Sequence, residues 1–134
     1  MGSGSGILAI AAIKLGARTA LGIEVDAEAV PAAEDNAVKN GVADRVRFLI
    51  GDAGVLAPLA GPADLIVSNI LRLVNETLLA PILAALGPGG VVVFSGMEVA
   101  EAGTFRPVLA GVGLVAFDEV VDEGWWSVAV RRAG

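Results

Sequence analysis

Short apolar segments alternate with helix-like segments along this chain, and this alternation constrains the fold more than any other feature. The apolar segments have the length and composition of buried strands and cover residues 19–25, 45–50, 64–69 and 91–95. The helical patterns that flank them cover residues 7–15, 27–39, 73–86 and 100–110. Because parallel strands are joined through crossover helices, this order predicts an α/β fold with a mostly parallel sheet.

The last segment predicts an antiparallel hairpin. Residues 113–121 and 125–131 have strand composition and are joined by Asp122-Glu123-Gly124. Successive residues of a strand point to opposite faces, so the side chains of Trp125 and Trp126 should lie on opposite faces of the sheet. We expect one of them in the core and the other over a helix or a substrate groove.

Proline and glycine mark the expected breaks between these elements. Residues 53–63 are predicted to form a loop, and residues 87–90 a turn. Pro31 conflicts with the helix at 27–39, because proline beyond the first turn removes a helix hydrogen bond. That helix should therefore start late or bend at Pro31, with Asp26 as its candidate N-cap.

Composition limits the class of protein. The 134 residues suffice for one domain, and 55% hydrophobic against 18% charged residues fits a sheet that is buried on both faces. We expect no membrane association, because no apolar run reaches the roughly 18 residues of a membrane span, and we expect a cytoplasmic location, because no cleavable leader is evident. A net charge of -6 argues against a nucleic-acid partner and is compatible with a basic protein or peptide.

Three residue types are absent, and their absence restricts the chemistry. The chain has no Cys, no His and no Tyr. It therefore lacks thiolate and imidazole metal ligands, a Ser-His or Cys-His nucleophile and a tyrosine acid. Catalysis would have to depend on carboxylates, amides, backbone donors and positioning.

A glycine-rich loop opens the chain. Gly2, Gly4 and Gly6 alternate with serine and precede the first helix, which is typical of a loop that brings backbone N–H groups to a ligand. A flexible tail or a cloning remnant is the alternative. The G-x-G-x-G spacing fits S-adenosylmethionine enzymes, whereas the G-x-G-x-x-G of dinucleotide enzymes would need a glycine where Ile7 stands.

Polar residues close three of the predicted strands. Glu24, Asp52 and Asn69 follow apolar runs, and ligands of parallel sheets bind at the carboxyl ends of the strands. Glu24 can accept hydrogen bonds from both ribose hydroxyls of a nucleotide. Each residue also has a structural alternative: a solvated strand end for Glu24, a turn for Asp52 and a turn cap for Asn69.

Several motifs together resemble the catalytic domain of the PrmA-type ribosomal protein L11 methyltransferases. They cover nearly the whole chain and comprise residues 2–12, 21–26, 34–37, 40–42, 47–49, 64–71, 88–90, 95–97 and 123–126. The resemblance implies a Rossmann-like class I methyltransferase sheet of order 3-2-1-4-5-7-6. It also implies S-adenosyl-L-methionine as cofactor, with its methionine end on the loop of Gly2, Gly4 and Gly6. Its ribose would lie on Glu24, its adenine near Asp52, and its methyl group beside Asn69.

The chain departs from the family pattern at its start. The family has a hydrophobic strand ending in Asp before the glycine loop, and a separate N-terminal domain that recognises the substrate. Neither is present, so we expect residues 1–134 to be a partial methyltransferase domain whose first strand is missing. An unpaired sheet edge would follow, and with it possible self-association.

The resemblance implies methyl transfer to a protein amine, a lysine or an N-terminal amine, with ribosomal protein L11 as the possible substrate. Asn69 would be the catalytic residue and no metal is required. The sequence leaves two alternatives open, a non-catalytic fragment or S-adenosylmethionine-binding module, and a nicotinamide-dependent oxidoreductase. The loop spacing and the absence of Tyr, His and Cys disfavour the oxidoreductase.

Overall fold

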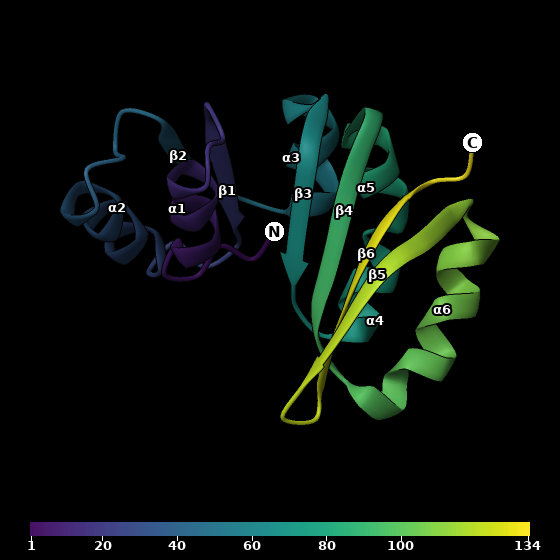
Figure 1. The fold of residues 1–134 in the computed structure, drawn as a ribbon. Helices are drawn as coiled ribbons and strands as arrows, with labels where there is room; N and C mark the ends of the chain where they lie inside the picture. Colours follow the sequence, from purple (N-terminus) through teal and green to yellow (C-terminus); the bar gives the residue numbers. More distant parts are fainter. The chain divides into compact units, whose positions relative to one another are not determined.

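A computed structural model describes all residues from 1 to 134. The chain divides into two compact units, which are described separately: unit 1 is Met1–Leu56 and unit 2 is Ala57–Gly134. Both have the α/β character that the sequence predicts, with parallel strands in each and an antiparallel hairpin at the C-terminus (Figure 1). None of the helices has the length and hydrophobicity of a membrane-crossing segment.

Unit 1 is a small two-stranded parallel sheet with two helices. Strand β1 (Ala20–Glu24) pairs with β2 (Val46–Ile50), and helices α1 (Ile7–Lys14) and α2 (Val30–Lys39) contact these strands. One aliphatic cluster forms its core and consists of Ile10, Ile13, Ala37, Val42 and Val46. The predicted strands and helices of this half are confirmed.

The start of α2 differs in part from the prediction. The helix begins at Val30, so Pro31 falls in its first turn, where the missing N–H costs no hydrogen bond. Asp26 does not cap the helix, and the prediction of that cap is wrong. Its carboxylate accepts a hydrogen bond from the Glu28 N–H at 2.9 Å, which forms a local turn ahead of the helix.

Unit 2 contains a four-stranded sheet of order β3-β4-β6-β5. Strand β3 (Ala63–Asn69) is parallel to β4 (Leu86–Glu98), whereas β6 (Trp125–Arg132) is antiparallel to both β4 and β5 (Leu114–Asp122). The implied order 3-2-1-4-5-7-6 counts the missing first strand as strand 1, so that β1 to β6 correspond to strands 2 to 7. Within each sheet the observed order agrees with it. Glu123 and Gly124 form the two-residue hairpin turn, and both have the positive φ that such a turn requires, 46° and 85°.

Two predicted segments between the strands are wrong. Residues 53–60 form helix α3 (Ala53–Ala60) instead of a loop, and Pro58 lies inside it. Asp52 explains how this helix starts, because its carboxylate accepts a hydrogen bond from the Gly54 N–H at 2.7 Å. Residues 73–86 form two helices instead of one, α4 (Arg72–Thr77) and α5 (Leu79–Ala85). Pro81 lies in the first turn of α5, where its missing N–H is tolerated.

Strand β4 is longer than predicted, because it begins at Leu86 and includes residues 87–90, where Gly89 has a φ of 70°. Ala63 lies opposite Leu86 and Leu65 lies opposite Val91, so the register shifts across this glycine-rich stretch. A short 3₁₀ helix, η1 (Val99–Glu101), then leads into α6 (Ala102–Gly111).

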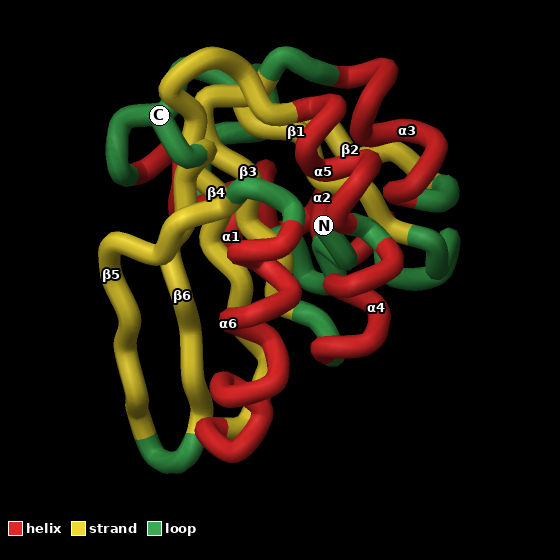
Figure 2. The backbone as a smooth tube through the Cα atoms, turned by 90° about the vertical axis from the view of Figure 1, so that its right-hand side faces the viewer, coloured by secondary structure: helices red, strands yellow, loops and turns green.

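Aromatic side chains form the core of unit 2. Phe105 of α6 packs edge-on against Phe94 and Trp126, with ring centroids 5.3 and 6.4 Å apart. Trp126 is 1% exposed and Trp125 is 57% exposed, so the predicted division of the two tryptophans is confirmed. Figure 2 shows helices α4 and α6 on the same side of the four-stranded sheet.

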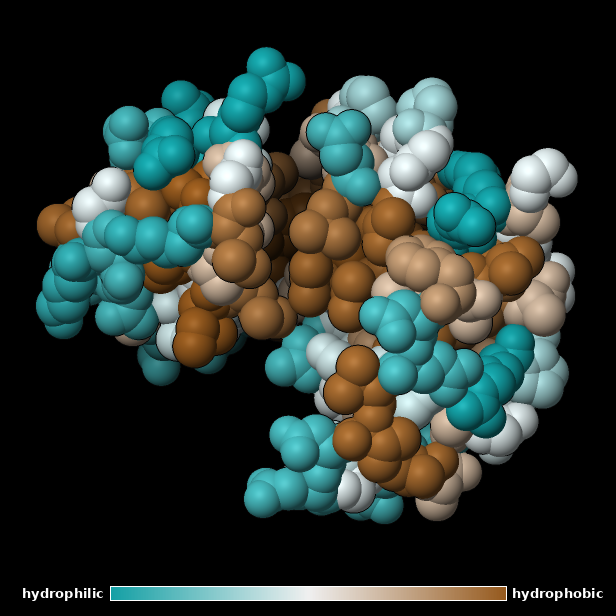
Figure 3. Space-filling model, viewed as in Figure 1, coloured by the Kyte–Doolittle hydropathy of each residue, from teal (hydrophilic) through white to brown (hydrophobic).

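The other face of the four-stranded sheet is apolar as well. Figure 3 shows apolar side chains gathered over β3 and β4 on the face in view. Leu65 is exposed, and Val67, Val91 and Val93 are half-buried. The helices of unit 2 therefore cover one face of its sheet. The other face is also apolar, as is typical of strands that are buried on both faces.

Candidate functional site

In unit 1, the glycine loop is held directly at the carboxyl end of β1. The Gly4 N–H donates to Oε2 of Glu24 at 2.7 Å, and the Ser3 N–H donates to the Ile23 carbonyl at 3.1 Å. The Asp26 N–H donates to the other carboxylate oxygen, Oε1, at 3.1 Å. The structure thus brings together the loop and the acid that the sequence singles out, and these bonds argue against a flexible tail.

Glu24 is buried and charged. It is 8% exposed, and its pKa is lowered first by the Gly4 N–H, then by the Asp26 N–H, while burial acts in the opposite direction. The Met1 amino group adds a smaller lowering effect, and its own pKa is lowered by burial. A carboxylate has about four lone-pair sites and the N–H groups of Gly4, Asp26 and Val25 use at most three of them, so Glu24 retains the capacity to accept a hydroxyl donor.

The glycines of the loop have different structural roles. Gly4 has a φ of 49°, and a β-carbon there would meet nothing within 4 Å, so its surface is open to a ligand. Gly6 has a φ of 78°, and a β-carbon there would lie 2.8 Å from the Phe48 ring, so this glycine permits close packing. Gly2 also has a positive φ, 63°.

Ser3 gives the loop an unsatisfied polar atom. Its Oγ is buried and makes no hydrogen bond. Buried hydroxyls are nearly always paired in folded proteins, and an exception needs an explanation. A polar ligand seated on the loop would supply the missing partner, so the residues present fit a small, polar, nucleotide-like group.

Asp52 lies at the same edge of the small sheet. The Gly51 N–H donates to the Glu24 carbonyl at 2.8 Å, which places the segment after β2 beside the end of β1. The Asp52 carboxylate is exposed and caps α3, a role that was not predicted for it from the sequence.

In unit 2, Asn69 ends β3 and lines a cavity of about 800 Å³. The cavity lies at the carboxyl ends of β3 and β4 and beside the hairpin. Its walls are Asn69, Ile70, Leu71, Val74, Ser95, Gly96, Val120, Asp122, Trp125, Trp126 and Ser127. Most of them are apolar, and the few polar groups among them fit a site that takes one extended side chain.

Gly96 lies directly against the side chain of Asn69. A β-carbon on Gly96 would lie 2.7 Å from Oδ1 of Asn69 and 2.9 Å from the Ile70 nitrogen. Gly96 has a φ of 80°, so both its conformation and its missing side chain are required there.

Sequence analysis missed a buried polar network behind Asn69. The Ser68 hydroxyl donates to Oδ1 of Asn75 at 2.7 Å, and Nδ2 of Asn75 donates to the Ile70 carbonyl at 3.1 Å. Ser68 and Asn75 are both fully buried. They hold the turn that carries Asn69, and no local signal set Asn75 apart from its polar neighbours Glu76 and Thr77.

The predicted site residues therefore form two groups. Gly2, Gly4, Gly6, Glu24 and Asp52 lie at the strand ends of unit 1, and Asn69 lies in the cavity of unit 2. No group of three or more acidic side chains is arranged to bind a metal ion.

Comparisons with known proteins identify the family that the chain resembles. Residues 1–133 match the family described as ribosomal protein L11 methyltransferase (PrmA). The L11 methyltransferase of Thermus thermophilus is 39% identical over 132 residues, which are 98% of this chain and 50% of that protein. The L11 methyltransferase of Pelotomaculum thermopropionicum is 36% identical over 98% of this chain and 42% of that protein. The chain thus spans about half the length of these relatives.

Solved structures give the same result. The ribosomal protein L11 methylase of Lactobacillus delbrueckii subsp. bulgaricus matches 99% of this chain and 67% of its own, with a TM-score of 0.90 and 34% identity. An RNA methyltransferase of Salinibacter ruber, solved with S-adenosyl-L-homocysteine, matches 96% of this chain with a TM-score of 0.75 and 27% identity. The chain belongs to the ribosomal protein L11 methyltransferase (PrmA) family.

Proposed function

We propose that this chain binds S-adenosyl-L-methionine and takes part in methyl transfer to a protein amine. One observation carries the proposal: the N–H of Gly4 in the glycine loop is bonded to the buried, charged Glu24 at the end of β1. Family membership and the S-adenosyl-L-homocysteine bound by the Salinibacter ruber neighbour support it.

Each residue at the carboxyl end of β1 and β2 has a proposed role. The loop of Gly2, Gly4 and Gly6 holds the methionine end of the cofactor with its open surface and its backbone. Glu24 accepts hydrogen bonds from the ribose hydroxyls through its remaining lone pairs. Asp52 lies beside the adenine.

Asn69 is proposed as the residue beside the reacting groups. When bound, the cofactor supplies an activated methyl group. Transfer of that methyl group from sulfur to an amine depends more on the alignment of the reacting atoms than on acid–base groups. Orientation alone can contribute about 7–11 kcal/mol. The Asn69 amide oxygen can accept a hydrogen bond from the incoming amine and direct its lone pair. Ser68, Asn75 and Gly96 keep that amide in place.

The proposed acceptor is a lysine or an N-terminal amine of ribosomal protein L11, after the relatives that carry that name. The alternative is a chain that binds the cofactor without transferring the methyl group. Cofactor binding and methyl transfer therefore need separate measurements.

Calorimetric titration tests the binding step. We expect S-adenosyl-L-homocysteine to bind and NAD not to bind. Glu24→Ala should weaken binding at least about tenfold, because each hydrogen bond to a charged acceptor contributes roughly 1.5–3 kcal/mol. Glu28→Ala, which removes an exposed acid from the same turn, is the matched control and should bind like the wild type. Unchanged affinity in a folded Glu24→Ala protein would exclude the assignment.

A further inference from the structure

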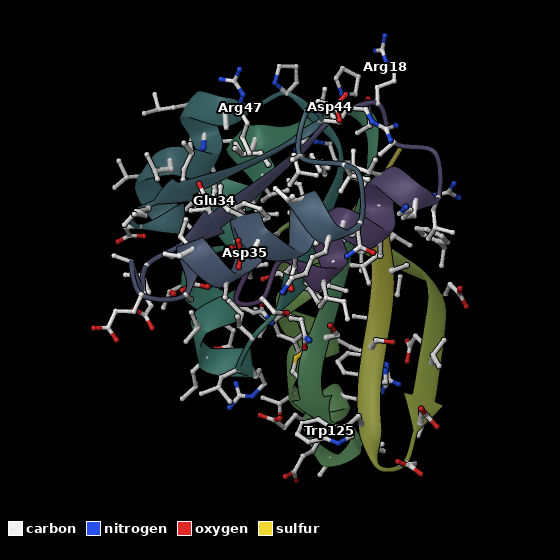
Figure 4. The ribbon with its side chains drawn as sticks, turned by 90° about the vertical axis from the view of Figure 1, so that its left-hand side faces the viewer. Arg18, Glu34, Asp35, Asp44, Arg47 and Trp125 are labelled. Carbon is white, nitrogen blue, oxygen red and sulfur yellow. The ribbon has the colours of Figure 1, made fainter.

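The hairpin of unit 2 places an exposed indole between two acidic positions. Trp125 on β6 lies directly opposite Asp122 on β5 and directly opposite Glu98 on β4. Residues opposite each other on neighbouring strands project to the same face, so these side chains form one row across the sheet. Figure 4 labels Trp125 at the turn end of the hairpin.

Trp125 and Asp122 also line the Asn69 cavity. Leu71, Val74 and Val120 are apolar residues of the same wall. The cavity therefore combines the aromatic face of Trp125, the carboxylate of Asp122 and an apolar wall. The amide of Asn69 lies in the same cavity, at the end of β3.

The charge of Asp122 is not neutralised within the structure. Asp122 forms no ion pair, whereas the arginines of unit 2 that do form them bind other acids. Arg72 pairs with Glu76 and Glu101, and Arg106 pairs with Glu119. Glu98 does not line the cavity, and it forms a capping box with Glu101 at the start of η1. Asp122 is thus the carboxylate of this cavity that is available to a cation.

We propose that Trp125 and Asp122 select a primary alkylammonium group, as carried by a lysine side chain or a chain's terminal amine. A cation over an indole face and a carboxylate beside it are both favourable, and Leu71 and Val120 can contact the methylene stem. The inference rests on the proposed function and assigns the residues that recognise its acceptor. Asp122 binds the cation and does not deprotonate it, because a carboxylate is a far weaker base than an alkylamine.

Nuclear magnetic resonance of the indole N–H groups tests this assignment on the intact chain. The two tryptophans give two signals, and Trp125→Phe identifies the Trp125 signal by its loss. The protein is titrated at neutral pH with n-butylammonium chloride and, separately, with 1-butanol, which has the same carbon chain and no charge. We expect the amine to shift the Trp125 signal and to bind at least about tenfold more tightly than the alcohol.

Asp122→Asn should reduce this preference to within about threefold, since the amide keeps the shape and removes the charge. Asp118→Asn removes an acid from the same strand outside the cavity, and it should leave the preference unchanged. Equal binding of amine and alcohol by the wild type, binding of neither, or a full preference in Asp122→Asn would overturn the inference.

A titration of the same samples with S-adenosyl-L-homocysteine separates this inference from the proposed function. Asp122→Asn should leave the cofactor affinity within about twofold of the wild type. An amine preference without cofactor binding would contradict the proposed function and support the cation site. Cofactor binding without an amine preference would contradict only the cation site.

Discussion

Unit 1 and unit 2 are stabilised by different means. Unit 1 has two strands and an aliphatic core that includes Ile10, Ile13 and Ala37, whereas unit 2 has four strands and packs Phe94, Phe105 and Trp126 together. Two-stranded sheets are marginally stable alone, and three or more strands with an apolar face are usually needed. The residues assigned to the cofactor therefore lie in the half with the smaller, two-stranded sheet.

This difference has a functional consequence. Segments that bind ligands are often drawn from the less stable parts of a protein, and a ligand that binds only the folded state stabilises that state. We therefore expect the cofactor to order unit 1, and we expect unit 2 to remain folded without it.

The largest expected effect is on unit 2. Trp126→Ala should lower the free energy of unfolding by about 3–5 kcal/mol, because it removes a buried indole from an aromatic core. The indole N–H also donates to Glu119 at 2.8 Å, and Glu119 would keep only its bonds from Arg106. Urea denaturation followed by circular dichroism measures the change. Trp125→Ala is the matched control and should cost less than about 1 kcal/mol, and an equal loss in both variants would contradict the assigned core.

The next prediction concerns the second edge of β1, which pairs with no strand and accepts a bond from the Ser3 N–H at Ile23. Adding an upstream hydrophobic strand that ends in Asp should raise the melting temperature by at least about 5 °C, since several new backbone hydrogen bonds contribute roughly 1 kcal/mol each. It should also strengthen S-adenosyl-L-homocysteine binding and reduce self-association through the exposed edge.

An extension of the same length made of Gly and Ser is the control for the added strand. Thermal melting, calorimetry and sedimentation compare the two proteins. Identical melting temperatures and affinities for both extensions would show that the edge of β1 needs no partner.

A substitution at Asn69 tests the comparison of the two units through the rate of methyl transfer, and its expected effect is smaller. In a chain that carries the upstream strand, Asn69→Ala should lower the rate of methyl transfer to ribosomal protein L11 by about tenfold or more, because the acceptor loses its orientation. The affinity for S-adenosyl-L-homocysteine should stay nearly unchanged. Equal losses of rate and affinity would place Asn69 in the cofactor site instead.

The smallest expected effect depends on pH. The pKa of Glu24 is lowered in the folded state by the N–H groups of Gly4 and Asp26, so its contribution to stability is present above the ordinary glutamate pKa of 4.5. That contribution is lost as the pH falls through the lower pKa of the folded state. Glu24→Gln should destabilise the protein by about 1 kcal/mol at neutral pH and by less in acid.

Urea denaturation at several pH values measures this change, and Glu28→Gln serves as the control. A destabilisation by Glu24→Gln that stays constant from neutral pH to acid would contradict the role of the charge.

Local patterns were sufficient to predict most of the fold. The strands ending in Glu24 and Asn69 are short apolar runs closed by a polar residue. Such runs indicate buried strands without any knowledge of the tertiary structure. The hairpin was predicted from two strand-like runs around Asp122-Glu123-Gly124, and the structure confines its turn to Glu123 and Gly124.

The errors arose where tertiary context decides. Pro58 and the glycines around α3 favour a loop, yet the Asp52 cap and packing of the segment support a helix. The buried contact between Ser68 and Asn75 joins residues seven positions apart, and nothing in either local pattern specifies it. The sequence indicates a ligand loop at Gly2, Gly4 and Gly6, whereas the close approach of the Phe48 ring to Gly6 is visible only in three dimensions.

Hydrogen–deuterium exchange with and without S-adenosyl-L-homocysteine tests most directly the claim that the cofactor orders the less stable unit. In the free protein, backbone amides of β1 and β2 should exchange faster than those of β4 and β6. The cofactor product should slow exchange most in the glycine loop and β1, and should change β4 and β6 least. Equal exchange in both sheets of the free protein, or protection by the ligand that leaves residues 1–56 unaffected, would contradict this claim.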